Sequence, residues 1–240
     1  MMPYRPDLSR RALAIAAALV ALHLPVTAGA QTTTGPITKD ARMSDKSAPA
    51  ATLSVPPGQG RLPLPTREDL TPDEQAFYDK NPTAKTNLSR LLTLAPTLAP
   101  HFRAFNVAMA TSIEVPPIDR ELACIATLTL ERGNWEIAQH REVARMMGIP
   151  DEKFAAVEQE RYGDPMFTER EKAVLAFTRQ SVKSVRVDDG TFHALAKFYS
   201  PRQLVELTWV IGNYMALARV SEMAEIPVES SAGASFWKDR

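Results

Sequence analysis

Three ionisable side chains in the middle of the chain have the types and spacing that proton transfer needs. Glu136 and His140 are four residues apart, so on a helix they lie on one face and can reach each other. Glu121 lies upstream, directly before an uncharged run over residues 122–130. A histidine gives or takes a proton near neutral pH, and a neighbouring carboxylate can orient the ring or set its tautomer.

The same residues also have a purely structural interpretation. An acid in the first turns of a helix complements the helix dipole, which would explain Glu121. A Glu–His pair on a solvent-exposed helix face contributes only about a few tenths of a kcal/mol. Because the spacing alone favours this second interpretation for Glu136 and His140, the elements that position the residues have to be considered.

Two helices can be drawn through this stretch, and they form a central helical hairpin over residues 117–147. The first begins at Pro116 and Pro117, whose fixed φ suits a helix start. Its uncharged run is typical of a helix that is buried on most faces. The second helix ends at Gly148, and Pro150 blocks any continuation.

The remaining regular structure is also predicted to be helical. Many helix starts carry a cap or an early proline, as in the capping box that begins at Thr71, and no alternating β-branched runs typical of strands occur. The sequence therefore predicts an all-α, single-domain helical bundle. The expected helices span residues 71–80, 87–94, 96–110, 117–132, 135–147, 151–160, 168–183, 189–199 and 201–223.

The first thirty residues have the features of a signal peptide. Arg5, Arg10 and Arg11 form a positive segment, and residues 12–24 form an apolar stretch that is short for a membrane span. The paired arginines also fit a twin-arginine signal. We therefore predict a signal peptide over residues 1–30 and a periplasmic or secreted protein.

Signal cleavage is expected after Ala30, because residues 28–30 read Ala-Gly-Ala, a small-x-small site. Mass spectrometry of the protein from its native host should then show a chain that begins at Gln31. A chain that begins at Met1 or at Met43 would contradict this prediction.

The composition of the remaining residues predicts a flexible lead, a folded domain and a C-terminal tail. Residues 31–65 are rich in Thr, Ser, Ala, Pro and Gly and bury too little apolar area to fold, which predicts a flexible lead. The folded domain is expected over residues 66–228, with a C-terminal tail over residues 229–240.

The 240 residues include 28 basic and 28 acidic ones. This balance, with the basic residues scattered, argues against a nucleic-acid partner, and no membrane contact is expected after signal cleavage.

The order of motifs resembles the carboxymuconolactone decarboxylase / alkylhydroperoxidase D-like superfamily. The resemblance covers about residues 70–228, continues through residues 167–171 and 204–219, and implies a helical bundle of that type. It also implies a homo-oligomer, a trimer or a hexamer. The residues that carry it in the hairpin are Glu121, Gly133, Trp135, Glu136, His140 and Gly148.

One departure from the superfamily pattern selects a branch. In the peroxidase branch, the active helix carries two cysteines three residues apart and a histidine four residues after the second. Those two cysteine positions fall here on Gly133 and Glu136, and the histidine falls on His140. The chain therefore resembles the non-redox, decarboxylase-like branch.

The resemblance implies a cofactor-independent enzyme, a lyase or isomerase similar to carboxymuconolactone decarboxylase. Its substrate would be a small molecule, an unsaturated or aromatic-derived carboxylic acid or lactone, and its chemistry acid–base proton transfer. We expect no metal, because two carboxylates and one imidazole make a weak ligand set. The expected catalytic residues are Glu121, Glu136 and His140, and the expected substrate-binding residues are Trp135, Tyr214, Arg219 and Arg103.

Arg219 is included because a pattern occurs twice. Gly-Asn-aromatic-x4-basic is found at residues 133–140 and again at residues 212–219, which would give His140 and Arg219 related positions. Chance, or a Tyr214 and Arg219 that merely pack on a long helix, explains the repeat equally well.

Two other function classes stay open. One is thiol peroxidase chemistry, although Cys124 is the only cysteine and no resolving thiol accompanies it. A single Cys on an apolar helix is usually a core residue. The other is a non-catalytic binding or scaffold protein with the same fold, since fold alone does not supply a substrate.

Overall fold

The computed structural model describes residues 55, 58–80 and 82–229, so the predicted signal peptide and most of the predicted lead and tail lie outside the described residues. Within the described residues all regular structure is helical, which confirms the all-α prediction. No helix in this part of the chain is both long and apolar enough to cross a membrane. The elements are the 3-10 helices η1 (Arg67–Asp69) and η2 (Pro82–Lys85) and the α-helices α2 (Pro72–Lys80), α3 (Asn87–Leu92), α4 (Ala99–Thr111), α5 (Pro117–Glu131), α6 (Asn134–Met146), α7 (Asp151–Glu158), α8 (Glu169–Ser184), α9 (Asp189–Ala196) and α10 (Pro201–Ala224).

Side-chain caps fix several helix starts where the sequence predicted them. The Thr71 backbone N–H donates to a Glu74 oxygen at 3.0 Å, and the Glu74 N–H donates back to the Thr71 hydroxyl at 3.4 Å. Thr168 and Glu171 form the same reciprocal box at the start of α8. Each box satisfies backbone N–H groups that have no partner within the first helical turn.

One of the two differences of three residues from the predicted helices lies at the start of α4, and the other at the end of α9, which stops at Ala196. The sequence predicted a helix from Pro96, but α4 begins at Ala99, and residues 96–98 form a turn. The N–H groups of both Leu98 and Ala99 donate to the Ala95 carbonyl, at 2.9 Å each. Pro100 occupies the first turn of α4, the position that suits proline, so Pro96 is left to the preceding turn. The other ends agree with prediction to within three residues.

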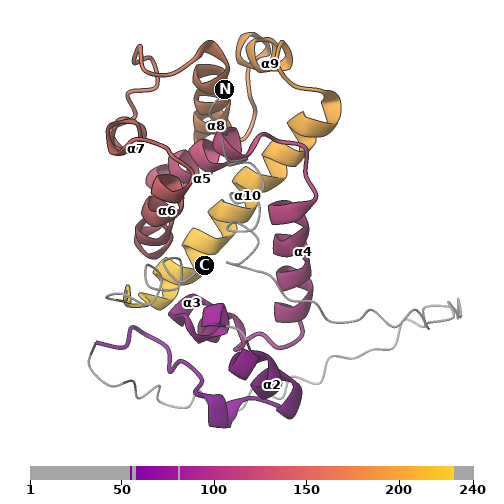
Figure 1. Cartoon of the computed structure of the whole chain (residues 1–240), viewed down its shortest axis with the longest axis vertical. Helices are drawn as coiled ribbons and strands as arrows, with labels where there is room; N and C mark the ends of the chain where they lie inside the picture. Colours follow the sequence, from indigo (N-terminus) through magenta and orange to yellow (C-terminus); the bar gives the residue numbers. More distant parts are fainter. Residues whose placement is uncertain (1–54, 56–57, 81, 230–240) are drawn as a thin grey trace, which may run out of the picture.

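Helix α5 is the centre of the packed bundle (Figure 1). Every residue from Asp119 to Leu128 is buried, and α5 packs most extensively against α8 and α10. Leu122 and Ile125 join a cluster with residues of α6, α7 and α8, whereas Ala123 joins a second cluster with residues of α8, α9 and α10. The predicted burial of the uncharged run is therefore confirmed.

The corner between α5 and α6 brings the hairpin against α10. Helix α5 ends at Glu131, its C-cap residue Arg132 has a left-handed φ of 60°, and Gly133 follows. A Cβ on Gly133 would lie 3.0 Å from the Ala218 Cβ on α10 and 3.2 Å from a Glu136 carboxyl oxygen. A glycine at residue 133 thus lets α10 approach the hairpin closely.

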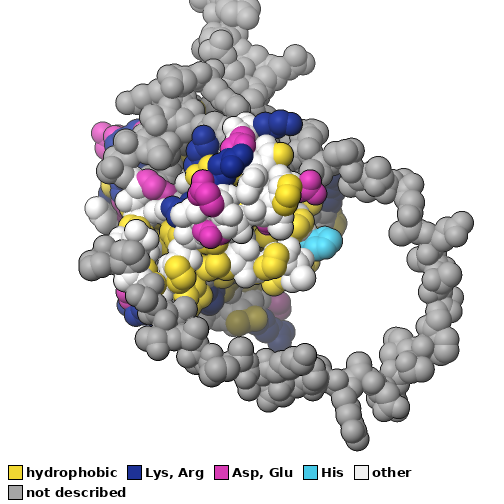
Figure 2. Space-filling view, turned by 90° about the horizontal axis from the view of Figure 1, so that it is seen from below, with side chains coloured by type: hydrophobic (Ala, Val, Ile, Leu, Met, Phe, Trp, Pro, Cys, Tyr) yellow, Lys and Arg dark blue, Asp and Glu magenta, His cyan; other side chains and the backbone are white. Residues whose placement is uncertain are grey.

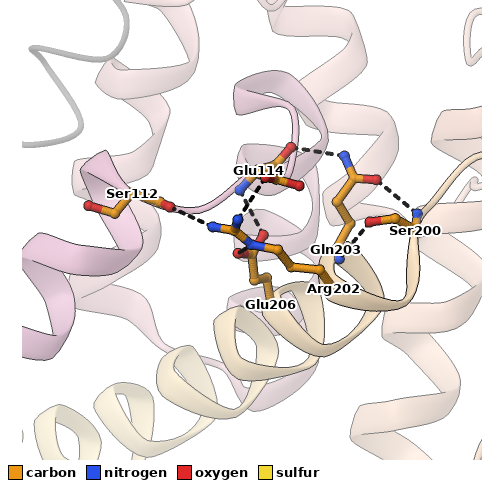
Figure 3. A network of polar contacts seen from close by, with 6 residues as sticks. All are labelled: Ser112, Glu114, Ser200, Arg202, Gln203 and Glu206. Atoms are coloured by element: carbon orange, nitrogen blue, oxygen red, sulfur yellow. Dashed lines mark hydrogen bonds and ion pairs between the residues drawn. The ribbon is translucent and has the colours of Figure 1, made fainter.

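The start of α10 is fastened to the connection between α4 and α5 (Figure 3). Arg202 donates to a Glu114 carboxyl oxygen at 2.7 Å and to the Ser112 carbonyl at 3.2 Å. The Glu114 N–H donates to Glu206 at 2.7 Å, and Gln203 donates to the Glu114 carbonyl at 3.0 Å. This network fixes α10, which supplies one wall of the site described below.

The packed region extends slightly beyond the predicted 66–228 at both ends. Leu64 is buried in a cluster that includes Trp135 and Ile226, and Leu62 packs against it. At the other end, Glu229 accepts a hydrogen bond of 2.7 Å from the Trp135 indole N–H. A few flanking apolar and acidic side chains thus contact the bundle just outside residues 66–228, and the domain boundaries themselves stay a prediction.

Candidate active site

Glu121 and His140 meet in the interior between α5 and α6. A Glu121 carboxyl oxygen lies 2.7 Å from His140 Nδ1, and the two residues are 3% and 5% exposed. The sequence predicted that Glu136 would orient the histidine, since the two share a helix face. The structure gives that place to Glu121, because packing of α6 on α5 turns the shared face of α6 toward the neighbouring helix. The expected Glu136–His140 pairing is therefore corrected.

This contact selects one tautomer of the imidazole. An ionised carboxylate only accepts hydrogen bonds, so beside an ionised Glu121 the hydrogen of neutral His140 lies on Nδ1. Nε2 then carries a lone pair and makes no hydrogen bond with the described part of the chain. A buried carboxylate behind an imidazole also stabilises the imidazolium that forms when Nε2 takes a proton.

Glu136 is buried in a different environment. The Ser221 hydroxyl on α10 donates to Glu136 Oε2 at 2.9 Å, whereas Oε1 has no hydrogen-bond partner among the described residues. Burial raises the pKa of the Glu136 carboxyl above its ordinary value, and the Ser221 hydrogen bond opposes that shift only in part. Burial therefore makes protonation of Glu136 easier than for an exposed glutamate, and a protonated Oε1 could donate a hydrogen bond.

Glu136→Gln is expected to change how stability depends on pH. The raised pKa means that, between the unfolded and folded pKa values, the folded state binds more protons, so stability falls as pH rises through that window. Glutamine removes this loss while keeping an acceptor for Ser221. The melting temperature of the variant relative to wild type should rise from about pH 4.5 upward and level off above the folded pKa. A difference that does not vary with pH would contradict the raised pKa.

A small cavity opens beside His140. Its volume is about 60 Å³, and Trp135 and Tyr214 are among the residues that line it. The Tyr214 ring stands edge-on to the His140 imidazole, with ring centroids 4.9 Å apart and planes at 83°. The complete lining is Thr86, Leu88, Ser89, Asn106, Trp135, Glu136, Gln139, His140, Tyr214 and Leu217.

Sequence reasoning missed several of these lining residues. Thr86, Leu88 and Ser89 come from α3 and the residue before it, which the sequence gives no reason to place beside the hairpin. Gln139 precedes His140 and follows Glu136 by three residues, so helical spacing could have identified it.

Neither arginine that was predicted to bind substrate lines this cavity. Arg219 is exposed on α10 and pairs with Glu131 at 2.8 Å. Arg103 is half-buried on α4 and lies over the Phe77 ring of α2 at 5.2 Å. The repeated Gly-Asn-aromatic pattern does not give related positions either: Asn134 begins α6, whereas Asn213 is buried within α10, so the matching basic residues face different surroundings.

Cys124 belongs to the site, which sequence reasoning did not predict. Its thiol lies in a group with Glu121 and His140 whose possible ligand atoms are all within 4.8 Å of one another. The Tyr214 hydroxyl also lies close to this thiol. The signal in the sequence was the three-residue spacing from Glu121, which puts both side chains on one stripe of α5.

Glu121, Cys124 and His140 are also close enough together to be considered as ligands of a metal ion. Carboxylate, thiolate and imidazole are ligand types that zinc accepts. Two ligands at about 2.0 Å in a tetrahedral shell lie roughly 3.3 Å apart, so the 2.7 Å contact of Glu121 with His140 would have to open first. The arrangement as it stands is therefore a hydrogen-bonded pair suited to moving a proton.

Cys124 is expected to resist thiol reagents in the folded protein. It is 1% exposed, and burial raises the pKa of its thiol well above the ordinary value, so little nucleophilic thiolate forms. Labelling with iodoacetamide should be slow in native buffer and complete in denaturant. Fast native labelling would instead indicate an accessible, activated thiol and would favour redox chemistry.

Comparison with known proteins identifies the fold. No protein-family model and no curated protein sequence matches the chain. Among solved structures, an uncharacterized peroxidase-related protein from Ralstonia eutropha JMP134, with an alkylhydroperoxidase AhpD core, is 17% identical; the match covers 72% of this chain and 94% of that one at a TM-score of 0.63. A peroxidase-related protein from Silicibacter sp. TM1040 is 16% identical, with 75% and 97% covered at a TM-score of 0.64.

A third similar structure is the debrominase Bmp8 in its apo form, which is 18% identical with 63% of this chain and 81% of that one covered at a TM-score of 0.52. At these identities the likeness shows the fold. The predicted resemblance to the alkylhydroperoxidase D-like superfamily is thus confirmed at the level of fold, and the set of similar structures includes an enzyme.

Proposed function

We propose that this chain, an all-α protein with the alkylhydroperoxidase D-like fold, is a cofactor-independent lyase or isomerase that transfers protons on a small unsaturated or aromatic-derived carboxylic acid or lactone. The observation that carries the proposal is the buried contact of 2.7 Å between Glu121 and His140 Nδ1, beside a cavity that His140 lines. A surface pair or a dipole-complementing acid would not need such burial.

The residues divide the chemistry as follows. His140 Nε2 removes a proton from a carbon next to a carbonyl group, and Glu121 stabilises the resulting imidazolium. The negative charge moves to the carbonyl oxygen, where the Gln139 amide, or Glu136 when it is protonated, can donate a hydrogen bond. Return of the proton from His140 to a different carbon completes an isomerisation. For decarboxylation, the imidazolium protonates the carbanion that remains when carbon dioxide leaves.

A thiol peroxidase function has less support from the site. Peroxide reduction by this fold needs a pair of thiols, and the two positions that would hold them are Gly133 and Glu136. Cys124 is a single buried cysteine. A Cβ at residue 133 would already lie 3.0 Å from Ala218, so the corner has little room for a cysteine side chain.

Deuterium exchange tests the proposed function directly. The purified protein would be incubated in deuterium oxide with a panel of unsaturated carboxylic acids and lactones, and NMR would follow the hydrogens next to each carbonyl group. A substrate should take up deuterium or form product, because each catalytic cycle passes a proton through His140. A protein that binds members of the panel without exchange or product would instead be the non-catalytic binding protein.

A further inference from the structure

The cavity beside His140 is too small for a complete substrate. Its volume is about 60 Å³, whereas pockets for small organic ligands typically measure about 300–1,000 Å³. Next to it lies a larger groove of about 340 Å³, whose lining residues are all apolar. Leu217 of α10 belongs to the walls of both.

Helices α3, α4 and α10 each contribute to both the cavity and the groove. On α4, Asn106 lines the cavity, and Phe102 and Ala99, at helical spacing on the same face, line the groove. On α10, Tyr214 lines the cavity, Val220 lines the groove and Leu217, midway between them, lines both. On α3, Leu88 lines the cavity and Leu91 lines the groove. We therefore treat the two as neighbouring parts of one cleft, with a polar end at His140 and an apolar end toward the start of α4.

The apolar end reaches the surface. Leu94 and Leu98, in the turns before α4, and Met223, near the end of α10, line the groove and are 45%, 67% and 54% exposed. Figure 2, seen from the end of the molecule where α2 and α3 lie, shows several hydrophobic side chains at the surface. A ligand could therefore enter the groove from solvent and place its other end at His140.

The polar end lacks a cation that could pair with an anionic ligand. No Arg or Lys occurs among the described residues that line the cavity. Arg103 and Arg219, the arginines expected to bind substrate, lie elsewhere. Burying an anion without a cationic partner is unfavourable, whereas a neutral carbonyl group needs only a donor such as the Gln139 amide.

We infer that the ligand of this cleft is a neutral carbonyl compound with an apolar tail, such as an alkyl lactone. Its carbonyl group lies at Gln139 and His140, and its tail lies between α3, α4 and α10. This inference rests on the proposed function and narrows its substrate class, because it excludes the free carboxylic acids.

Three probes test the neutral head group and the apolar tail separately. They are δ-dodecalactone, its ring-opened hydroxy acid, and δ-valerolactone, which has no tail. Isothermal titration calorimetry on the wild-type protein should give an affinity for δ-dodecalactone at least about tenfold above that for either other probe, since each buried methylene adds to binding. If the hydroxy acid bound as tightly as δ-dodecalactone, the inference of a neutral head group would be wrong. If δ-valerolactone bound as tightly as δ-dodecalactone, or if no lactone bound, the inference that the groove holds an apolar tail would be wrong.

Filling the groove provides a matched test. Ala216 is exposed on α10 and lines the groove, so Ala216→Trp should occupy the space of the tail without disturbing the core. Ala104→Trp, on an exposed α4 position outside the groove, is the control. We expect Ala216→Trp to lower the affinity for δ-dodecalactone at least about tenfold. Ala104→Trp should leave this affinity unchanged. Equal effects of the two variants would overturn the groove as the tail site.

The same measurements keep this inference apart from the proposed function. His140→Asn should still bind δ-dodecalactone, because the tail contacts remain, even though exchange chemistry is lost. Selective binding of δ-dodecalactone without any deuterium exchange would support the proposed ligand of the cleft and refute the proposed enzymatic function. Deuterium exchange with short free acids would support the enzymatic function and refute a neutral ligand with an apolar tail.

Discussion

Replacing His140 with asparagine is expected to lower turnover by about 10²–10⁴-fold, the usual contribution of a general acid or base, while the protein stays folded. The asparagine amide can occupy the place of Nδ1 and donate to Glu121, so the buried carboxylate keeps a partner. It has no group that titrates near neutral pH, so it cannot accept a proton from the substrate. Turnover from the deuterium-exchange substrate and thermal melting measure the two effects separately.

Alanine would be a less informative replacement at residue 140. It leaves Glu121 buried without its hydrogen-bond partner, which costs about 1–3 kcal/mol, so a loss of activity could reflect a damaged fold. The control substitution is His193→Asn on α9, where the histidine is exposed and far from the cavity lining. That variant should match wild type in both measurements. Full turnover in His140→Asn would end the proposed mechanism.

Glu121→Gln tests whether the pair acts as a unit. A glutamine can no longer stabilise the imidazolium, so turnover should fall strongly in the single variant as well. Residues that act together are not additive, and the double variant with His140→Asn should be no slower than the slower single variant. Losses that multiply would show that Glu121 contributes independently of His140.

The sequence predicted the scaffold of this site well, because local rules govern it. Pro117 begins α5, Gly148 follows α6, and the uncharged run of α5 is buried, each for a reason that can be read within a few residues. The hairpin and the identities of Glu121 and His140 followed from these rules and from the order of the motifs.

The contacts within the site could not be predicted in the same way. Glu136 and His140 are neighbours on one helix, yet the partner of His140 is nineteen residues away on another helix, which depends on how α5 and α6 pack. Arg219 was expected at the substrate because a short pattern recurs, but its surroundings are set by the solvent-facing side of α10. Helix α3 enters the lining through tertiary packing, for which the sequence carries no periodic signal.

Phe154→Ala is expected to cause the largest loss of stability among the substitutions considered. Phe154 is 1% exposed and is the largest fully buried side chain among the described residues, so its removal leaves a cavity that the surrounding helices cannot close. Such replacements typically cost about 3–5 kcal/mol. For a folded region of this size, that corresponds to a fall in melting temperature of roughly 6–20 °C.

The position of Phe154 links this loss to the site. It packs from α7 into the cluster that contains Leu122 of α5 and Ala144 of α6, and the Arg141 guanidinium lies 4.3 Å from the centre of its ring. Leu122 follows Glu121 on α5, and Ala144 lies one turn after His140 on α6. The cluster therefore holds the two helices at the separation that the Glu121–His140 contact requires.

Differential scanning calorimetry of Phe154→Ala, Phe154→Leu and Phe198→Ala would measure the effect. Phe198 is 45% exposed, so its loss should change the melting temperature by no more than about 2–4 °C, whereas leucine at residue 154 should fall between wild type and alanine. Turnover of Phe154→Ala should also decline, and it should decline less in Phe154→Leu, because the residual packing decides how well α5 and α6 keep their spacing. A Phe154→Ala protein that melts like Phe198→Ala would show that α7 does not support the bundle as its burial indicates.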